Sequence, residues 1–508
     1  MASQTLSELR VSAAALPPTK ACAHLAAGLE WRHLDTETRL HARRHLLDTL
    51  GAAIAGADQS ATTTVAATLD WAGETRADRP GLVPGSNVQG LGLLAAAHLM
   101  GTAAHGLELD DGYRPGMMHP GCVVVPAALL LGAHLHKSGP EVLTAVVAGY
   151  EVACRITAAT HPRARWRGFH PTSAAGVFAA AAAAGRLLAL DAAQMESALG
   201  IAASSSAGLF TFLDGGDVKR LHGGLGAREG LFAALLAAQG LVGPPNALES
   251  ANGYFHSHAG GDLPDHDYSG LALLDAGGHP DSFLVTQCYI KPYASCRHIH
   301  GPIEMLLALR DAHGFTADDV AAIHVGTYAV AAAHGTPGWS EMTTAQMSMP
   351  YVLAVALMRG RVSPAEFSDS ERADPAIAAL CARIITTVDA DCEARYPGLR
   401  PARLRVTLKD GRELSAQVDE PPGEPQRRLS DAGLEQKFTH MATPVLREAA
   451  TARIVDGVRG LERCTDISEL LALTVPQTAT RSGTGGAAAR PASAAADAAD
   501  FQARTGKA

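Results

Sequence analysis

Apolar residues recur at helical spacing through most of the first half of the chain. From Leu34 onward, leucine, isoleucine and alanine return every three or four residues, with Thr36 before the run as a possible cap. Asp191 and Gln194 form a plausible capping pair for a later helix. Small residues and few strand signals predict a large all-helical domain over residues 1–280. Its clearest helical runs are Leu91–Ala104, Gly139–Thr157, Ser173–Leu188, Ala192–Ala207 and Leu221–Gly240.

The pattern changes after about Asp281. Arg403–Leu408 and Glu413–Val418 alternate apolar and polar residues around an Asp-Gly pair, which is a strong hairpin signal. We therefore expect a mainly α protein with an inserted α+β domain, a smaller lid over residues 281–420. Three earlier segments of this domain are an extended Phe283–Lys291, a helical Pro302–Ala312 and a strand at Val320–Tyr328.

The last part of the chain predicts a return to helices and then a tail. Ser430–Thr439 and Pro444–Leu461 are expected to form a helix pair within residues 421–476, which belongs to the helical domain. From residue 477 to 508 the sequence is rich in Ala, Thr, Ser and Gly and has no period. Such a segment cannot bury enough apolar surface to order itself, so we expect it to be disordered.

Composition narrows the class of protein. With 47% hydrophobic residues in 508, the chain can bury a large core, so global disorder is excluded. Its net charge is 42 − 51 = −9 and it has no basic stripe, which argues against nucleic-acid binding. The longest apolar run lies around Val123–Gly132 and falls short of the roughly 20 residues of a membrane span. We expect no membrane association.

The cysteines and the first residues bear on location. Eight cysteines form no CxxC pair and no regular spacing, which is typical of a cytoplasmic chain with reduced thiols and no zinc site. The opening residues have no basic start and no apolar core, so no export signal is expected. We therefore predict a cytoplasmic protein that needs no metal and no cofactor.

Four clusters could carry chemistry. The first is an irregular connection that holds His105, Glu108, Asp110, Asp111 and His119. Loops on a rigid scaffold often carry catalysis, so His119 is a candidate base in an active-site loop. The alternative is a solvated loop in which the aspartates cap helices.

The second and third clusters begin helices. His170 precedes an apolar helix, whose positive end would lower its pKa and favour neutral imidazole. Its alternative is an exposed residue in a capping turn. Lys219, Arg220 and His222 enter a Gly-rich helix start, which suits a carboxylate or phosphate, or else is a basic surface loop. Neither a phosphate-binding GxxxxGK[ST] loop nor a strand–GxGxxG–helix site occurs.

The fourth cluster opens the inserted domain. Lys291, Arg297, His298 and His300 lie within ten residues and make a compact anion site plausible. The two histidines have a spacing that suits a metal on a strand, but no carboxylate or cysteine pattern completes a ligand set. Cys296 also permits a nucleophilic thiol, although no signature supports that interpretation.

Together these segments resemble the MmgE/PrpD family, which includes 2-methylcitrate dehydratase and cis-aconitate decarboxylase. Singly each motif is weak, but they follow the family order from about residue 35 to 470. The motifs are Leu46–Gly51, Gly101–His105, His119–Gly121, Gly149–Glu151, Gly168–His170, Lys219–Gly224, Lys291–Tyr293, Cys296–Arg297, Ser348–Tyr351, Leu429–Asp431 and Lys437–Phe438.

The resemblance implies a homodimer, metal-free chemistry and a site in the cleft between the helical domain and the lid. It places at that site Glu108, Asp111, His119, His170, Lys219, Lys291, Cys296 and Tyr351. Animal cis-aconitate decarboxylases carry Asp, Thr and His where this chain has Glu108, Gly112 and Cys296. These departures count against cis-aconitate itself as the substrate.

The expected activity is that of a lyase that abstracts a proton next to a carboxylate of a small di- or tricarboxylate. A 2-methylcitrate dehydratase-like hydro-lyase is the main interpretation. The alternatives are a cis-aconitate decarboxylase-like carboxy-lyase, a dicarboxylate epimerase or isomerase, and a non-catalytic binding homologue. Such chemistry needs cations around the substrate and a base with a pKa near neutral.

The candidate residues divide into two groups by expected role. In proton transfer, His119 or His170 takes the proton, the other histidine or Tyr351 protonates the leaving group, and Glu108 or Asp111 orients a histidine. The residues expected to bind the substrate are Lys219, Lys291, Cys296, Arg297 and His222.

Overall fold

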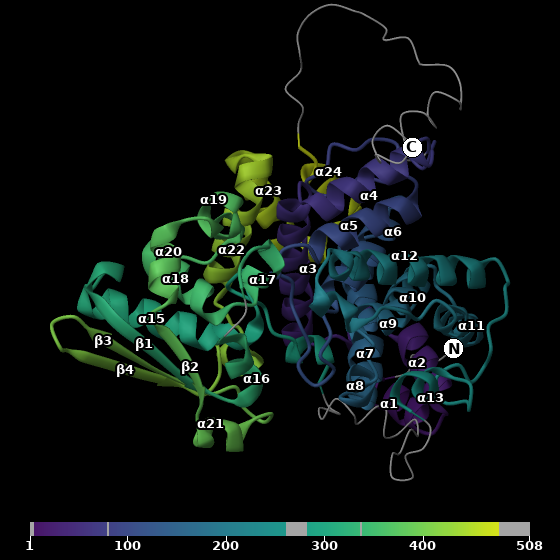
Figure 1. Cartoon of the computed structure of the whole chain (residues 1–508). Helices are drawn as coiled ribbons and strands as arrows, with labels where there is room; N and C mark the ends of the chain where they lie inside the picture. Colours follow the sequence, from purple (N-terminus) through teal and green to yellow (C-terminus); the bar gives the residue numbers. More distant parts are fainter. Residues whose placement is uncertain (1–4, 79–80, 261–281, 336–337, 477–508) are drawn as a thin grey trace, which may run out of the picture.

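The protein, seen here in a computed structural model, has a helical part and a part built around a small sheet (Figure 1). The structure describes residues 5–78, 81–260, 282–335 and 338–476. The helical part lies on the right in Figure 1 and the sheet on the left. The predicted tail, residues 477–508, lies outside the described residues.

The helical part is built from alanine- and glycine-rich helices that pack closely around α6, α7 and α10. Its helices are α1 Leu6–Ala14, α2 Pro18–Gly28, α3 Thr36–Gly56, α4 Ser60–Trp71, α5 Leu93–Ala104, α6 Gly121–His134, α7 Gly139–Thr160, α8 Arg163–Trp166, α9 Pro171–Ala174, α10 Gly176–Leu187, α11 Ala192–Ala203, α12 Val218–Ala238 and α13 Tyr254–Ala259. Short 3₁₀ turns are η1 Trp31–His33, η2 Phe210–Asp214 and η3 Leu284–Gln287.

Glycines let α5 and α12 cross at very short range. A Cβ atom on Gly101 of α5 would lie 2.7 Å from the carbonyl oxygen of Gly223 in α12. A Cβ atom on Gly223 would lie 3.1 Å from the Cβ atom of His105. The crossing therefore brings the end of α5, where His105 lies, against the first turns of α12, which carry Lys219 and His222.

Helix α7 is long and apolar enough, by length and composition, to cross a membrane. It lies inside the protein, however, since 94% of its most apolar window is buried. Burial of this kind is what a core helix requires, and α7 packs against α6 and α10.

The smaller part contains a four-stranded sheet in the order β2-β1-β3-β4. Strand β1 runs parallel to β2 and antiparallel to β3, and β3 pairs with β4 across the predicted hairpin. Helices α15 and α18 form its other layer (Figure 1). The elements are η4 Arg297–Ile299, α15 His300–His313, η5 Ala317–Asp319, β1 Val320–Thr327, α16 Ala329–Ala332, η6 Ala333–Gly335, α17 Met342–Gln346, α18 Met349–Arg359, η7 Pro364–Phe367, α19 Asp369–Arg372, α20 Pro375–Cys381, β2 Ile384–Val388, α21 Ala390–Arg395, β3 Ala402–Leu408, β4 Glu413–Val418 and η8 Pro425–Arg427.

The chain then packs back on the helical part. Helices α22 Asp431–Leu446, α23 Glu448–Arg459 and α24 Ser468–Leu473 follow the sheet, with η9 Leu461–Arg463 between the last two. Gly51 of α3 lets Phe438 and Met441 of α22 approach closely. Residues from both ends of the sequence therefore share one core.

Several local predictions need correction. Phe283–Lys291 is not a strand: η3 occupies its first half, and only an isolated bridge joins Tyr289 to Gly112. Asp35, rather than Thr36, caps α3 by accepting a hydrogen bond from the Thr38 amide. Pro444 lies inside α22 instead of starting the next helix. The capping box of Asp191 and Gln194 and the hairpin are confirmed.

Candidate active site

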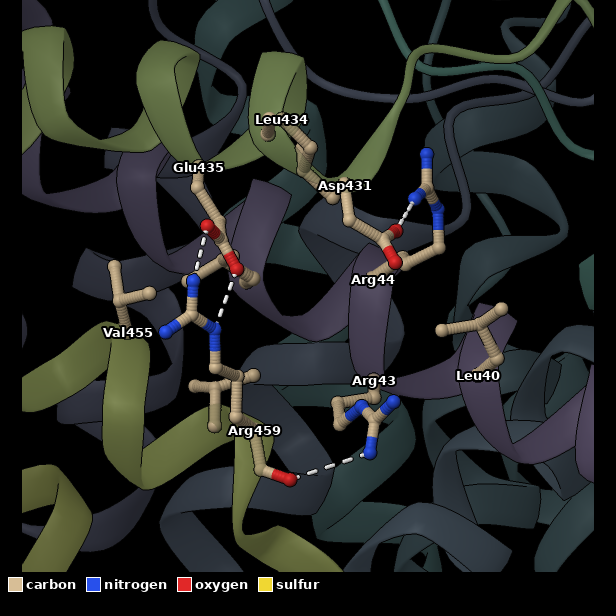
Figure 2. Close-up of a pocket in the computed structure, with 11 residues that line it drawn as sticks. Leu40, Arg43, Arg44, Asp431, Leu434, Glu435, Val455 and Arg459 are labelled. Carbon is tan, nitrogen blue, oxygen red and sulfur yellow. Dashed lines mark hydrogen bonds and ion pairs between the residues drawn. The ribbon is translucent and has the colours of Figure 1, made fainter.

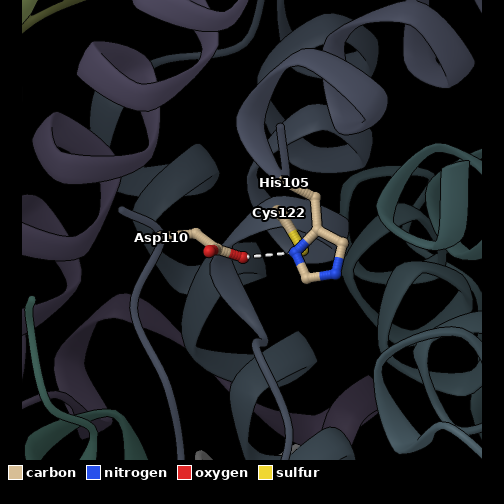
Figure 3. A group of neighbouring side chains, drawn as sticks. All are labelled: His105, Asp110 and Cys122. Carbon is tan, nitrogen blue, oxygen red and sulfur yellow. Dashed lines mark hydrogen bonds and ion pairs between the residues drawn. The ribbon is translucent and has the colours of Figure 1, made fainter. Parts of the chain in front are cut away.

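The connection between α5 and α6 gathers the first histidines. The Nδ1–H of His105 donates to Asp110 Oδ2 at 2.6 Å, and both side chains are buried (Figure 3). The His119 ring lies 5.2 Å from that of His105, and its Nδ1–H donates to the main-chain carbonyl of Asp111 at 2.6 Å. The loop therefore fixes the orientation of both rings through oxygen acceptors.

Two further histidines complete the cluster. His170 and His222 share a hydrogen bond between their Nδ1 atoms at 2.7 Å. His170 stacks on His105 at 5.8 Å between ring centroids. The edges of Phe210 and Phe212 contact the His170 ring. The imidazole rings of His105, His119, His170 and His222 therefore form one cluster, and Phe210 and Phe212 pack against its His170 ring.

These histidines are neutral at neutral pH. Burial lowers the pKa of His105 and of His222 to about 4, and in His105 it outweighs the opposing charge of Asp110. Burial also lowers the pKa of His119, and that of His170 falls well below its usual value. The expected effect at His170 is therefore present, but its main cause is burial rather than the helix end.

Two lysines converge on Glu108, which itself lies in a left-handed backbone conformation at φ 55°. Lys219, inside the first turn of α12, forms an ion pair with Glu108. The Lys291 Nζ atom lies 3.3 Å from Glu108 Oε2 and 3.9 Å from Asp110 Oδ1. Burial and the charge of Lys291 lower the pKa of Lys219. Both ammonium groups therefore depend on Glu108 for compensation.

The Asp111 side chain attaches the loop between α5 and α6 to the neighbouring helices. Its carboxylate accepts hydrogen bonds from the Gly121 amide at 2.9 Å and from the Tyr150 hydroxyl at 2.6 Å. His45 Nδ1 lies 2.7 Å from the same carboxylate. The main-chain carbonyl of Asp111, rather than its predicted side chain, therefore orients His119. The Asp111 carboxylate instead connects the loop to Gly121 of α6 and Tyr150 of α7.

Lys437 supports the same loop from α22. Its buried ammonium group donates to Asp48 of α3 and, at 2.9 Å, to the carbonyl oxygen of Leu109. Leu109 lies between Glu108, which holds the lysines, and Asp110, which holds His105. The C-terminal helices therefore contribute directly to the geometry of the cluster.

Two predicted residues lie elsewhere. The Tyr351 hydroxyl donates to the Glu366 carbonyl at 2.8 Å, and the ring packs near Trp339 and Phe367 in the core of the sheet-containing part. Arg297 is buried in an ion pair with Glu424 at 3.0 Å. Both side chains have structural partners, so neither joins the cluster as predicted.

Cys296 belongs to the segment that follows Lys291. Its Sγ atom lies 3.5 Å from Nε2 of His334, and its amide donates to the carbonyl of Gln346. His334 was not among the predicted residues because it lies in an alanine-rich stretch without a local signal. His105 and Asp110 stand in the acidic loop noted in the sequence, but their pairing depends on the fold.

Two pockets differ in their relation to the cluster. One, of about 550 Å³, lies between α12 and the helices α17 and α19, and Arg220, next to Lys219, lines it. The other, of about 420 Å³, lies between α3, α22 and α23 (Figure 2). Its arginines pair with Asp431, Glu435 and a main-chain carbonyl.

His105, Asp110 and Cys122 have ligand atoms within 4.8 Å of one another, which is a metal-like spacing (Figure 3). Metal binding needs a thiolate, however. Burial raises the pKa of Cys122 well above its usual value, and the thiol donates to the His119 carbonyl at 3.3 Å. These side chains form a hydrogen-bonded His–Asp pair beside a protonated thiol. A bound cation would itself favour the thiolate, so metal independence stays a prediction.

Comparison with known proteins agrees with the architecture. Residues 20–267 match the MmgE/PrpD N-terminal domain and residues 293–463 match the MmgE/PrpD C-terminal domain. The chain therefore belongs to the MmgE/PrpD family. This confirms the resemblance and the mainly helical fold with a small α+β part.

The relatives are named cis-aconitate decarboxylase or cis-aconitate decarboxylase-like protein. The cis-aconitate decarboxylase of Aspergillus terreus is 29% identical over 408 residues, 76% of this chain and 82% of the fungal protein. A cis-aconitate decarboxylase-like protein of Aspergillus oryzae is 31% identical over 75% of this chain and 82% of its own length. The mouse cis-aconitate decarboxylase is 26% identical over 90% and 93%. These relatives agree with a lyase of this family and favour the decarboxylase alternative over the dehydratase interpretation.

Proposed function

We propose that this protein is a carboxy-lyase that removes CO₂ from a small unsaturated polycarboxylate resembling cis-aconitate. The observation that carries the proposal is the convergence of Lys219 and Lys291 beside four neutral histidines. The relatives named above add support, because they are decarboxylases of comparable length.

The lysines suit the carboxylates that the product retains. Glu108 now occupies the position at which a substrate carboxylate would meet both ammonium groups. Substrate binding then requires Glu108 to release at least one ammonium group, which a multiply charged anion can replace with a stronger pair.

The aromatic side of the cluster suits the carboxylate that leaves. Loss of CO₂ breaks a C–C bond, leaves the electron pair on the carbon skeleton and removes charge from the departing group. A neutral, water-poor surface therefore favours the products over the charged carboxylate. Phe210, Phe212 and the neutral His170 offer such a surface, and Lys219 Nζ lies at its border, 5.9 Å from the centroid of the Phe212 ring.

Dehydration of a hydroxy acid is the second candidate, and a specific observation favours it. His119 and His170 are neutral and can each accept a carbon-bound proton, which elimination of water requires. Decarboxylation, in contrast, requires a proton donor.

Product analysis in heavy water separates the candidates. The purified enzyme is incubated with cis-aconitate, related unsaturated tricarboxylates and 2-methylcitrate, and the products are followed by NMR. We expect loss of CO₂ and incorporation of one solvent deuterium into the remaining skeleton. Lys291→Met serves as a control, since it removes the buried cation and should abolish turnover.

Other outcomes point elsewhere. Formation of an alkene from 2-methylcitrate without release of CO₂ would establish the dehydratase. Deuterium exchange with an intact skeleton would indicate an isomerase or epimerase. Tight binding without conversion of any compound would identify a binding homologue and overturn the proposal.

A further inference from the structure

We propose that Cys296 and His334 form a thiolate–imidazolium pair that donates the proton in the reaction. The inference rests on the proposed function, because decarboxylation must add a proton to carbon. Cys296 Sγ and His334 Nε2 are 3.5 Å apart, and His334 Nδ1 lies 2.9 Å from the Met347 carbonyl. A carbonyl only accepts, so Nδ1 carries a proton and Nε2 faces the sulfur. The Cys296 thiol therefore contacts the His334 imidazole, whose other nitrogen donates to the Met347 carbonyl that orients the ring.

The turn between α17 and α18 holds this pair against the active-site loop. The Gln346 carbonyl accepts the amide of Cys296, and the next carbonyl, that of Met347, accepts from His334. The Gln346 side-chain amide donates to Leu107 at 2.9 Å and to Ala294 at 3.1 Å. Leu107 directly precedes Glu108, and Ala294 lies two residues before Cys296. Gln346 and Met347 therefore connect the Cys296–His334 pair to Leu107, which directly precedes the Glu108 that contacts both lysines.

The charges around the pair favour its ionised form. Burial raises the pKa of Cys296, but the charges of His334 and Lys291 and the amide of His298 lower it to about 7. The thiolate in turn raises the pKa of His334 to about 9 despite partial burial. The neighbouring groups are the neutral His298 ring, stacked on His334 at 5.9 Å, the Tyr328 phenol and the side chain of Lys219, whose pKa burial and Lys291 lower.

The proton balance of the step is simple. The C–C bond to one carboxylate breaks and its electron pair stays on the carbon skeleton, where it takes the proton of His334 Nε2. CO₂ leaves, His334 becomes neutral, and water restores its proton. Cys296 forms no bond to carbon: its negative charge stabilises the imidazolium between turnovers. Burial disfavours the imidazolium forms of His105, His119, His170 and His222, whereas the imidazolium form of His334 is favoured.

The ion pair is tested without any substrate. The ultraviolet absorbance of the thiolate is recorded against pH for the wild type and for His334→Gln, each minus the matching protein with Cys296→Ala. We expect a midpoint near 7 in the wild type and a clear shift to higher pH in His334→Gln, which has lost the cation. An ordinary thiol midpoint of about 8.5 in the wild type, or identical midpoints, overturns the pair.

Turnover tests the role of the pair. His334→Gln keeps a donor for the Met347 carbonyl but carries no transferable proton, so kcat should fall by about 10²–10⁴-fold with little change in KM. Cys296→Ser should lower the upper pKa of the kcat–pH profile, which a purely structural residue would not move. The control is His324→Gln, a lid histidine that contacts Thr387 on the sheet, and its kcat should stay at the wild-type value.

The outcomes for the two proposals are distinct. A normal kcat in folded His334→Gln overturns proton donation while the decarboxylase proposal stands. If no substrate loses CO₂ with the wild type, the decarboxylase proposal fails and donation fails with it, and the absorbance result still decides whether the ion pair exists.

Discussion

The two sides of the candidate site hold histidines in opposite protonation states. On the helical side, His105 contacts a carboxylate, yet burial keeps its pKa near 4. On the side of the sheet-containing part, His334 contacts the sulfur of Cys296, and its pKa rises to about 9. His105 is surrounded by other imidazoles and by Lys219, whereas His334 is less buried and has one close anion. A single contact does not set the charge of a histidine; the balance between that contact and burial does.

This contrast predicts a division of labour: the helical side positions a substrate with neutral imidazoles and lysines, and the sheet-containing part supplies a proton.

His170→Ala should have the largest effect on turnover. The ring contacts two other histidines of the cluster, His105 and His222, so its loss should misplace them and the bound substrate and lower kcat by about 10²-fold. Steady-state kinetics provide the measurement. His98→Ala is the matched control, a partly buried histidine on α5 whose pKa burial also lowers. A folded His170→Ala protein with normal kcat would show that this ring does not position the substrate.

Lys437→Met should reduce stability strongly. It leaves the fully buried Asp48 carboxylate without its partner, and breaking a buried pair costs about 3–5 kcal/mol. Chemical denaturation gives the free energy of unfolding. The double variant Asp48→Asn/Lys437→Met should recover part of that loss, since no buried charge remains. If Lys437→Met alone were as stable as the wild type, the support of the loop from α22 would be refuted.

Lys219→Met should act mainly on KM. A charged hydrogen bond contributes about 1.5–3 kcal/mol, so losing one carboxylate contact should raise KM by about 10–100-fold. The control is Lys409→Met, an exposed lysine at the sheet hairpin. An unchanged KM with a reduced kcat would move Lys219 from substrate binding to the chemical step.

Tyr351→Phe should have the smallest effect. Its hydroxyl donates to a main-chain carbonyl in the lid core, a bond that contributes about 0.5–1.5 kcal/mol to stability. We expect a slightly lower melting temperature and a kcat within about twofold of the wild type. A loss of kcat by two orders of magnitude would mean that Tyr351 turns towards the substrate during turnover.

Local patterns predicted much of the fold. Helical periodicity located α5, α7 and α12 within a few residues, and the Asp-Gly turn located β3 and β4. These signals succeed because the period of an amphipathic element and the chemistry of a tight turn are encoded in neighbouring residues. The prediction of an extended Phe283–Lys291 was wrong in its first half, because so short an apolar run contains no period that would distinguish a strand from a turn.

The sequence predicted many of the residues that lie in the candidate site, but not which hydrogen-bond and ion-pair partners each side chain has. His119, His170, Lys219 and Lys291 were identified from their polar, glycine-rich surroundings, and the fold brings them together. The direction in which Tyr351 and Arg297 point depends on Glu366 and Glu424, which are distant in sequence from the cluster. His334 had no local signal at all, because only the turn after α17 places it beside Cys296.

The bond from Lys437 to Leu109 has a consequence for biosynthesis. A ribosome releases α5 and the loop after it more than three hundred residues before α22, so the nascent loop lacks the ammonium group that fixes its carbonyl. His105, Lys219 and Lys291 already precede α22, so Asp110 and Glu108 can meet those partners earlier. We expect the Leu109 carbonyl, in contrast, to gain its partner only when α22 packs against α3.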